Sequence, residues 1–157
     1  MNYEKFIREH QLNPEDFREA WAFCLGNPWE NPEEAEILNY PDYISEADKL
    51  AELVQTGKKT ATASAYADYV NENAPLPVVD GKYDIVLNGQ GEPVCAITTT
   101  KVYLMKFSEV TVDHARKEGE GDLSLDYWRK VHEDIYRTFG AFSPEMDIVC
   151  EEFRLIT

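Results

Sequence analysis

The sequence predicts a mixed α+β fold with a mostly antiparallel sheet. Segments with the alternation and β-branched residues of strands follow one another along the chain, and segments with helical periodicity do not alternate with them regularly. A chain of 157 residues with 43% hydrophobic residues also has the usual size of one domain and can bury a sizeable core. We therefore expect a single domain over residues 1–157, with a helical N-terminal region over about residues 1–44.

A first long helix is predicted in this N-terminal region. Residues 13–16 read as a helix start, with an Asn cap, Pro at the first helical position and acids in the first turn. An apolar stripe at i, i+3, i+4 and i+7 follows, and Gly26 ends it: Phe17, Ala20, Trp21 and Cys24. The next stretch, residues 27–44, contains three prolines and predicts a long loop, which either carries a specificity element or wraps the body. The second reading is favoured.

A second helix is predicted from Ser45 to Gly57. Ser45 with Asp48 three residues later resembles a capping box, and Leu50, Leu53 and Val54 supply a buried face. Gly57 is a natural terminator. The small and hydroxylated residues that follow suit a strand that enters a sheet.

The rest of the chain predicts a hairpin, two helices and a closing strand. Residues 83–88 and 94–104 read as the two strands, joined by a turn at Gly89–Gly91. Residues 111–117 form a short helix, Ser124 caps another through residue 139, and residues 148–156 form the last strand.

Composition limits the possible functions and locations. The 30 acidic and 15 basic residues give a net charge of −15, which opposes nonspecific binding to nucleic acid. No signal segment or membrane span is visible. Three widely spaced cysteines fit reduced thiols, and His114 and His132 lie on different predicted helices without ligand spacing. We expect a cytoplasmic protein that uses no metal or other cofactor and does not contact membranes; its oligomeric state stays open.

Residues 57–64 are the first candidate for a functional site. They bring Lys58 and Lys59 next to three hydroxyl residues, in a chain where basic residues are scarce: Thr60, Thr62 and Ser64. The competing interpretation is a solvated turn followed by strand-forming threonines. In a regular strand Thr62 faces away from Lys59, so a turn or bulge is needed to bring the two together.

The acidic, glycine-rich residues 118–122 are the second candidate. Their three carboxylates can supply a general acid or base, or oxygen ligands for a hard cation; the competing interpretation is a solvated turn. On the helix that follows, Trp128 belongs to a core stripe with Tyr127, Val131 and Ile135, although an aromatic side chain at a pocket edge can also stack on a base.

Taken together, these segments resemble the ASCH domain family. The resemblance lies in residues 47–64, in the strands at 83–87 and 94–100, in residues 107–110 and in residues 118–122 with Trp128 and His132, all in order. It covers about residues 21–156. It implies a fold similar to the PUA domain, a small β-barrel decorated with helices, and a role in binding or modifying RNA or modified nucleosides.

One branch of the family hydrolyses the acetyl amide of N(4)-acetylcytidine with a lysine, a threonine and a glutamate. Matching the motif implies Lys59, Thr62 and Glu118 as the catalytic residues. The surrounding pocket implies substrate contacts from Lys58, Thr60, Ser64, Glu120, Trp128 and His132. The sequence departs from this branch at Ser64, where the branch carries an arginine.

The implied chemistry contains a conflict over protons. A threonine attacks an amide only if a base takes its proton, and a lysine with an ordinary pKa of about 10.4 is almost entirely charged at neutral pH. An ionised Glu118 nearby raises the pKa of Lys59 further. Either Glu118 is neutral or distant in the resting site, or Lys59 stays charged and stabilises the oxyanion while Glu118 handles protons. An RNA or modified-nucleoside binding module without catalysis and a metal-independent ribonuclease remain as alternatives to the amidohydrolase.

Overall fold

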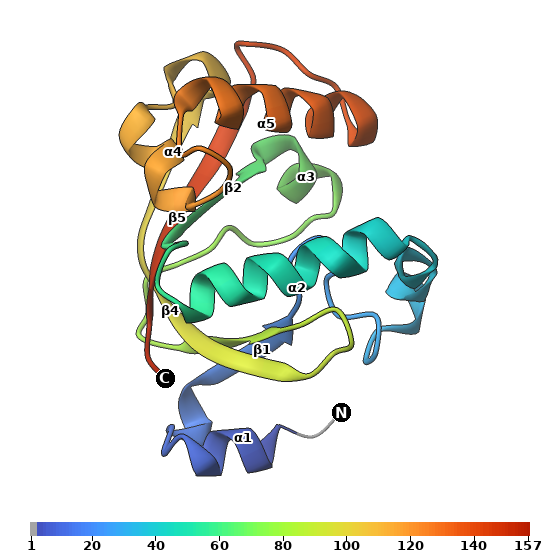
Figure 1. The fold of residues 1–157 in the computed structure, drawn as a ribbon, viewed down its shortest axis with the longest axis vertical. Coiled ribbons are helices and arrows are strands. Elements are labelled where there is room, and N and C mark those ends of the chain that lie inside the picture. Colours follow the sequence, from blue (N-terminus) through green and yellow to red (C-terminus); the bar gives the residue numbers. More distant parts are fainter. Residues whose placement is uncertain (1–2) are drawn as a thin grey trace. The chain divides into compact units, whose positions relative to one another are not determined.

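The computed structural model describes residues 3–157 and shows a mixed α+β fold (Figure 1). Hydrogen bonding joins five strands in the order β1-β3-β4-β5-β2. The strands are β1 (Phe17–Trp21), β2 (Ala61–Ala65), β3 (Tyr83–Leu87), β4 (Pro93–Lys106) and β5 (Asp147–Leu155). The α-helices are α1 (Glu4–Glu9), α2 (Pro41–Gln55), α3 (Tyr66–Asn71), α4 (Val112–Glu118) and α5 (Leu125–Phe139). Short 3-10 helices cover Pro14–Asp16, Pro32–Asn39 and Phe107–Glu109.

The chain divides into two compact units. Unit 1 comprises residues 1–57, 80–98 and 154–157, and unit 2 comprises residues 58–79 and 99–153. The long strands β4 and β5 contribute residues to both units. Every residue that the sequence singled out for chemistry lies in unit 2.

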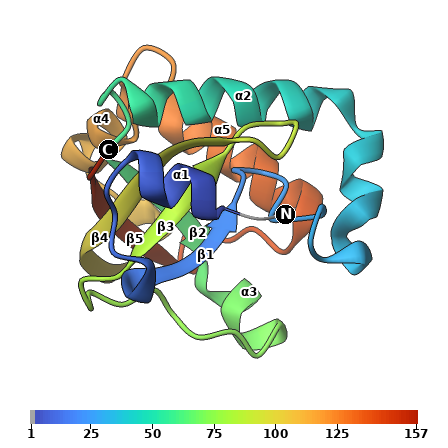
Figure 2. The same ribbon diagram turned by 90° about the horizontal axis from the view of Figure 1, so that it is seen from below.

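In unit 1, the prediction of a long helix that starts at residues 13–16 is wrong. Asn13 does cap a turn, since its Oδ1 accepts the N–H of Glu15 at 3.1 Å, but the turn ends after Asp16. Residues 17–21 then form β1, which pairs in parallel with β3 and lies beside it in Figure 2. Cys24 has a φ of +69°, which no helix accommodates. Pairing with β3 therefore overrides the helical spacing of the apolar residues.

The predicted loop over residues 27–44 is more regular than expected. It contains the 3-10 helix Pro32–Asn39, and α2 already begins at Pro41. Proline suits the first helical position because its fixed φ matches the helix and no N–H is lost there. Ser45 consequently lies inside α2 and is not its cap.

The predicted hairpin is confirmed. Strands β3 and β4 pair antiparallel, with a register shift between Val86 and Leu87. In the connecting turn, Asn88 Oδ1 accepts the N–H groups of Gln90 at 2.9 Å and of Glu92 at 3.0 Å. An Asn side chain that satisfies nearby backbone donors stabilises such a turn locally.

Unit 2 contains β2 paired antiparallel with β5, one residue to one, without a bulge. The two predicted helix starts are confirmed: Thr111 caps α4 by accepting the N–H of His114, and Ser124 caps α5 by accepting that of Tyr127. The buried core of this unit combines strand and helix residues: Ala65, Phe107, Val110, Ala115, Trp128, Tyr136, Ile148 and Cys150.

The predicted α+β class is confirmed, but the expected barrel does not close. The five-residue strands β1 and β2 form the two ends of the strand order and do not pair with each other in the described residues. Among residues 3–157, no helix is both long enough and apolar enough to span a bilayer.

Gly119 fixes the geometry at the end of α4, and replacing it tests this. Its φ is +72°, and a Cβ there would lie 2.2 Å from the carbonyl oxygen of Lys58. We expect Gly119→Ala to lower the free energy of unfolding by roughly 2–4 kcal/mol, because backbone strain and a backbone clash add.

Gly57→Ala is the matched control for Gly119→Ala. Gly57 has a similar φ of +78°, but a Cβ there would meet nothing within 4 Å. Urea unfolding of both variants measures the difference. Equal losses of stability would contradict close packing between Gly119 and Lys58.

Candidate functional site

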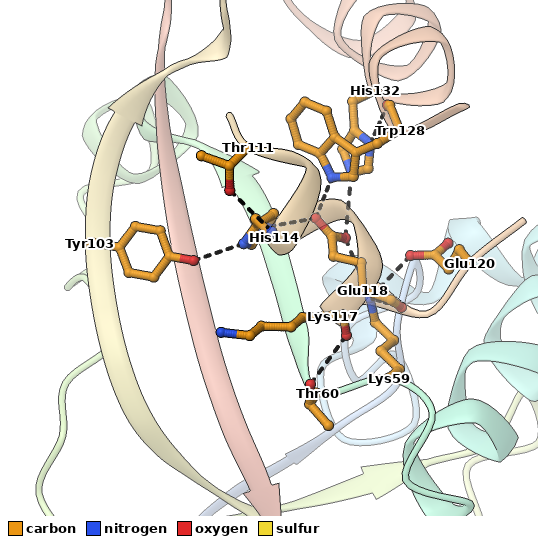
Figure 3. Close-up of polar contacts among 10 residues, drawn as sticks. All are labelled: Lys59, Thr60, Tyr103, Thr111, His114, Lys117, Glu118, Glu120, Trp128 and His132. Carbon is orange, nitrogen blue, oxygen red and sulfur yellow. Dashed lines mark hydrogen bonds and ion pairs between the residues drawn. The ribbon is translucent and has the colours of Figure 1, made fainter. Parts of the chain in front are cut away.

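The centre of the site is an ion pair between Lys59 and Glu118, both only 2% exposed. Lys59 follows the turn at the end of α2, and Glu118 is the last residue of α4. Lys59 Nζ lies 3.4 Å from Glu118 Oε1 and 3.1 Å from Glu120 Oε2 (Figure 3). Its ammonium also contacts the backbone carbonyl of Glu118 at 3.4 Å. The structure therefore brings the lysine-bearing segment and the acidic loop together.

Glu118 is held from three further directions. Its Oε2 receives hydrogen bonds from His114 Nε2 at 2.7 Å and from the indole N–H of Trp128. Its Oε1 lies 3.7 Å from His132 Nε2. Trp128 and His132 are stacked one helical turn apart on α5, with ring centroids 4.1 Å apart. Figure 3 shows these side chains converging on the carboxylate from α4 and α5.

These contacts fix the charge of Glu118. Burial by itself raises the pKa of this carboxyl, but the Lys59 ammonium and the hydrogen bond from His114 outweigh burial and lower the pKa to about 2. Glu118 is therefore ionised at neutral pH.

His132 is the neutral partner of this centre. Burial lowers its pKa, although the Glu118 carboxylate acts in the opposite direction. Its Nδ1 lies 2.8 Å from the carbonyl oxygen of Trp128, and because a carbonyl only accepts, Nδ1 carries the proton. In the neutral ring Nε2 then has a free lone pair on the side of Glu118.

A polar chain continues from His114 toward the surface. The hydroxyl of Tyr103, on β4, lies 2.9 Å from His114 Nδ1. Burial raises the pKa of Glu152, but the Lys117 ammonium, 3.1 Å away, and a hydrogen bond from Tyr103 outweigh burial. The pKa of Glu152 is therefore lowered. The buried carboxylate of Glu118 is thus connected to groups of intermediate exposure through His114 and Tyr103.

Backbone contacts hold the lysine segment against α4. The N–H of Thr60 donates to the carbonyl of Lys117 at 2.7 Å, and the Thr60 hydroxyl contacts the same oxygen at 3.3 Å. On the other side, Phe153 N–H donates to the Thr60 carbonyl at 3.0 Å. Lys59 is therefore fixed between α4 and β5 by its neighbour in the chain.

A small cavity of about 10 Å³ adjoins the centre. Its walls include Glu118, Glu120, His132 and Tyr127. This volume holds about one water molecule, so a larger ligand must enter with a change in the surrounding side chains or loop.

The structure brings together five of the residues predicted for the site and leaves the others further out. The five are Lys59, Glu118, Glu120, Trp128 and His132. Lys58 is exposed, Thr60 contacts α4, and Ser64 pairs through its hydroxyl with Tyr69 at 2.8 Å.

Thr62 is half-buried in β2, directly opposite Glu151. Paired residues share one face of a sheet and their neighbours occupy the other, so Thr62 shares a face with Glu151, and Ala63 shares the opposite face with Cys150. Cys150 belongs to the same buried cluster as Trp128. The role of Thr62 as a nucleophile stays a prediction.

His114 and Tyr103 were not among the residues predicted for the site. The four-residue spacing of His114 and Glu118 within one helix is a signal that could have found the first. Tyr103 reaches His114 from a different element, so no local pattern indicates it. Among residues 3–157, no group of three or more His, Cys, Asp or Glu side chains is arranged to hold a metal ion.

Comparisons with known proteins agree on one family. The ASCH domain family matches residues 36–157. The crystal structure of an ASCH domain from Lactobacillus crispatus JV V101 is similar with a TM-score of 0.76 and 25% identity, covering 98% of this chain and 92% of that one. A protein from Enterococcus faecalis V583 is similar with a TM-score of 0.70 and 31% identity, covering 99% and 87%. No curated protein matches the chain. The chain therefore belongs to the ASCH domain family, whose members are thought to bind RNA or to act on modified nucleosides.

Proposed function

We propose that this protein is an amidohydrolase that acts on an acylated nucleoside or a similar small amide. The observation that carries the proposal is the fully buried Lys59–Glu118 ion pair with neutral His132 beside it. Burying charges weakens folding unless every group is well paired, so such a cluster beside a cavity is a candidate for catalysis.

Lys59 supplies positive charge in this proposal. Its Nζ lies 3.4 Å from a carboxylate oxygen of Glu118 and 3.1 Å from one of Glu120, which is the geometry of an ion pair. Of the two arrangements that the sequence left open, the geometry supports the one in which Lys59 stays charged. A charged lysine is suited to stabilise the oxyanion that forms when a nucleophile attacks the amide carbonyl.

His132 is better suited than Glu118 to move protons. A carboxylate with a pKa of about 2 is a weak base at neutral pH. The neutral His132 ring can accept a proton at Nε2, and Glu118 Oε1, 3.7 Å away, then stabilises the imidazolium. The proton passes from His132 to the leaving amine, and the products are a carboxylic acid and the free amine.

The geometry favours a water molecule in the cavity of about 10 Å³ as the nucleophile, attacking in one step. The family resemblance implies Thr62 instead, which would form an acyl-enzyme that water then hydrolyses, but Thr62 lies on the face of β2 opposite the Trp128 cluster and reaches the site only if β2 changes. Thr62→Ala, with Thr100→Ala at an exposed threonine of β4 as its control, distinguishes them. A covalent acyl group on Thr62, detected by mass spectrometry, supports the first.

The net charge of −15 favours a small substrate without phosphates over an RNA strand. A noncatalytic RNA-binding module would show binding without turnover, with an affinity that falls as the salt concentration rises. A ribonuclease would cleave RNA in the presence of a chelator.

Turnover of N(4)-acetylcytidine tests the proposal. We expect the purified protein to release cytidine, and His132→Asn to lower kcat by roughly 10²–10⁴-fold because the proton acceptor is lost. Chromatography of the reaction mixture measures both. Lys130→Asn, a change on the same helix away from the cavity lining, should leave kcat unchanged.

Two results would contradict the proposed amidohydrolase activity. No deacetylation of N(4)-acetylcytidine or of related acylated nucleosides at high protein concentration would exclude the activity. Full activity in His132→Asn would exclude its role as the base.

A further inference from the structure

A second cavity lies along α5, beyond the Lys59–Glu118 centre. Its volume is about 320 Å³, within the range of small-molecule sites and at its lower end. One wall is apolar and comes from α5 and the segment after it: Ile135, Tyr136, Phe139 and Met146. The other wall comes from β2 and α3 and includes the polar residues Ser64, Asp68 and Asn71. We call it the α5 cavity.

The α5 cavity follows the smaller one along the same side of the helix. The smaller cavity is lined by Val131 and His132, and the α5 cavity by Ile135 and Tyr136, four residues further on in each case. Residues four apart lie above one another on a helix. The ring centroids of His132 and Tyr136 are 5.9 Å apart. The two cavities are therefore neighbours.

The spacing between the cavities suits one ligand that reaches into both. Their α5 residues centre near positions 130 and 137, which corresponds to about 10 Å at the helical rise of 1.5 Å per residue. This is comparable to the length of a nucleoside that carries an acyl group. The acyl end then lies near His132 and the nucleoside lies further along α5.

The lining of the α5 cavity matches the chemistry of a nucleoside. Phe139 is 63% exposed and adds an aromatic side chain to the lining, and bases stack on aromatic rings. The Asp68 carboxylate can accept both hydroxyls of a ribose diol, and the Asn71 amide can both donate and accept.

An unsatisfied hydroxyl in the wall also indicates a missing partner. Tyr136 is only 7% exposed, and its hydroxyl has no hydrogen-bond partner among residues 3–157. Buried hydroxyls are nearly always paired, so an orphan in the wall of a cavity suggests that a ligand or its water supplies the partner.

We propose that the α5 cavity binds the nucleoside part of the substrate, with the base against Phe139 and the ribose hydroxyls on Asp68. This proposal rests on the proposed function for the position of the acyl group, but nucleoside binding can be measured without turnover. It also assigns substrate specificity to residues of α3 and to the C-terminal turn of α5.

Binding of cytidine and hydrolysis of N(4)-acetylcytidine test this site separately. We expect Phe139→Ala and Asp68→Asn to weaken cytidine affinity, measured by calorimetry, at least tenfold and to raise KM by a similar factor, with kcat changed less than threefold. The expected factor corresponds to losing one stacking contact or one charged hydrogen bond. Val112→Ala removes an exposed apolar side chain and Asp134→Asn an exposed negative charge, both outside the cavity, and neither should change either quantity.

The outcomes distinguish the two proposals. Cytidine binding that weakens in both variants, without hydrolysis by the native protein, supports the nucleoside site and removes the amidohydrolase. Hydrolysis with unchanged KM and cytidine affinity in Phe139→Ala and Asp68→Asn overturns the nucleoside site and leaves the amidohydrolase in place. Absence of both binding and hydrolysis overturns both.

Discussion

Replacing Lys59 with methionine is expected to lower the free energy of unfolding by about 3–5 kcal/mol, the cost of leaving a buried charge without its partner. Lys59 and Glu118 are each only 2% exposed, so water cannot replace the lost ammonium. Methionine has a similar length, so the change removes the charge with little loss of packing. Urea unfolding at neutral pH measures the effect.

Lys58→Met is the matched control, because it removes the same kind of charge one residue earlier, at an exposed position. Its expected effect is within about 0.5 kcal/mol, as for most surface substitutions. A loss of less than about 1 kcal/mol in Lys59→Met would show that Glu118 finds another partner or takes up a proton. The double variant Lys59→Met with Glu118→Gln should recover part of the loss, because no unpaired charge remains.

The second large effect concerns the pH dependence of stability, which Glu118→Gln should reduce. The pKa of Glu118 is lowered from 4.5 to about 2 in the folded protein, so the unfolded chain binds the proton more readily. A carboxyl of this kind contributes stability that is fully present above pH 4.5 and is lost as the pH falls toward 2. The shift corresponds to about 3 kcal/mol.

Glutamine cannot ionise, so Glu118→Gln lacks this contribution at every pH. The difference in unfolding free energy between the native protein and the variant should therefore shrink by about 3 kcal/mol as the pH falls from 4.5 to 2. Urea unfolding at several pH values measures this difference. Glu36→Gln, at an exposed glutamate in unit 1, serves as the control. A constant difference across this range would contradict the lowered pKa of Glu118.

Both predictions follow from a cluster that folding alone does not require. Apolar residues of similar size would fill the space of Lys59 and Glu118 without the cost of removing two charges from water. Either side chain destabilises the fold if it lacks its partner. As a pair, Lys59 and Glu118 keep charged groups next to a cavity and a neutral histidine. The proposed function uses the charged lysine to stabilise an oxyanion and the neutral histidine to accept a proton.

The sequence by itself determined several local elements of both units. Thr111 and Ser124 predicted the starts of α4 and α5, and the alternation around residues 83–104 predicted the hairpin, because capping and strand patterns act over a few residues. The two segments that meet at the site, around Lys59 and around Glu118, were also visible as isolated motifs.

Only the tertiary structure decided how these motifs act together. Parallel pairing with β3 turned residues 17–21 from an expected helix into a strand, because contacts between distant segments outweigh weak local preferences. Contacts across 59 residues of chain joined Lys59 to Glu118, and contacts with Tyr103 completed the environment of His114. The charge of Glu118 follows from those contacts, since a pKa depends on burial and on neighbours that the sequence does not place in space.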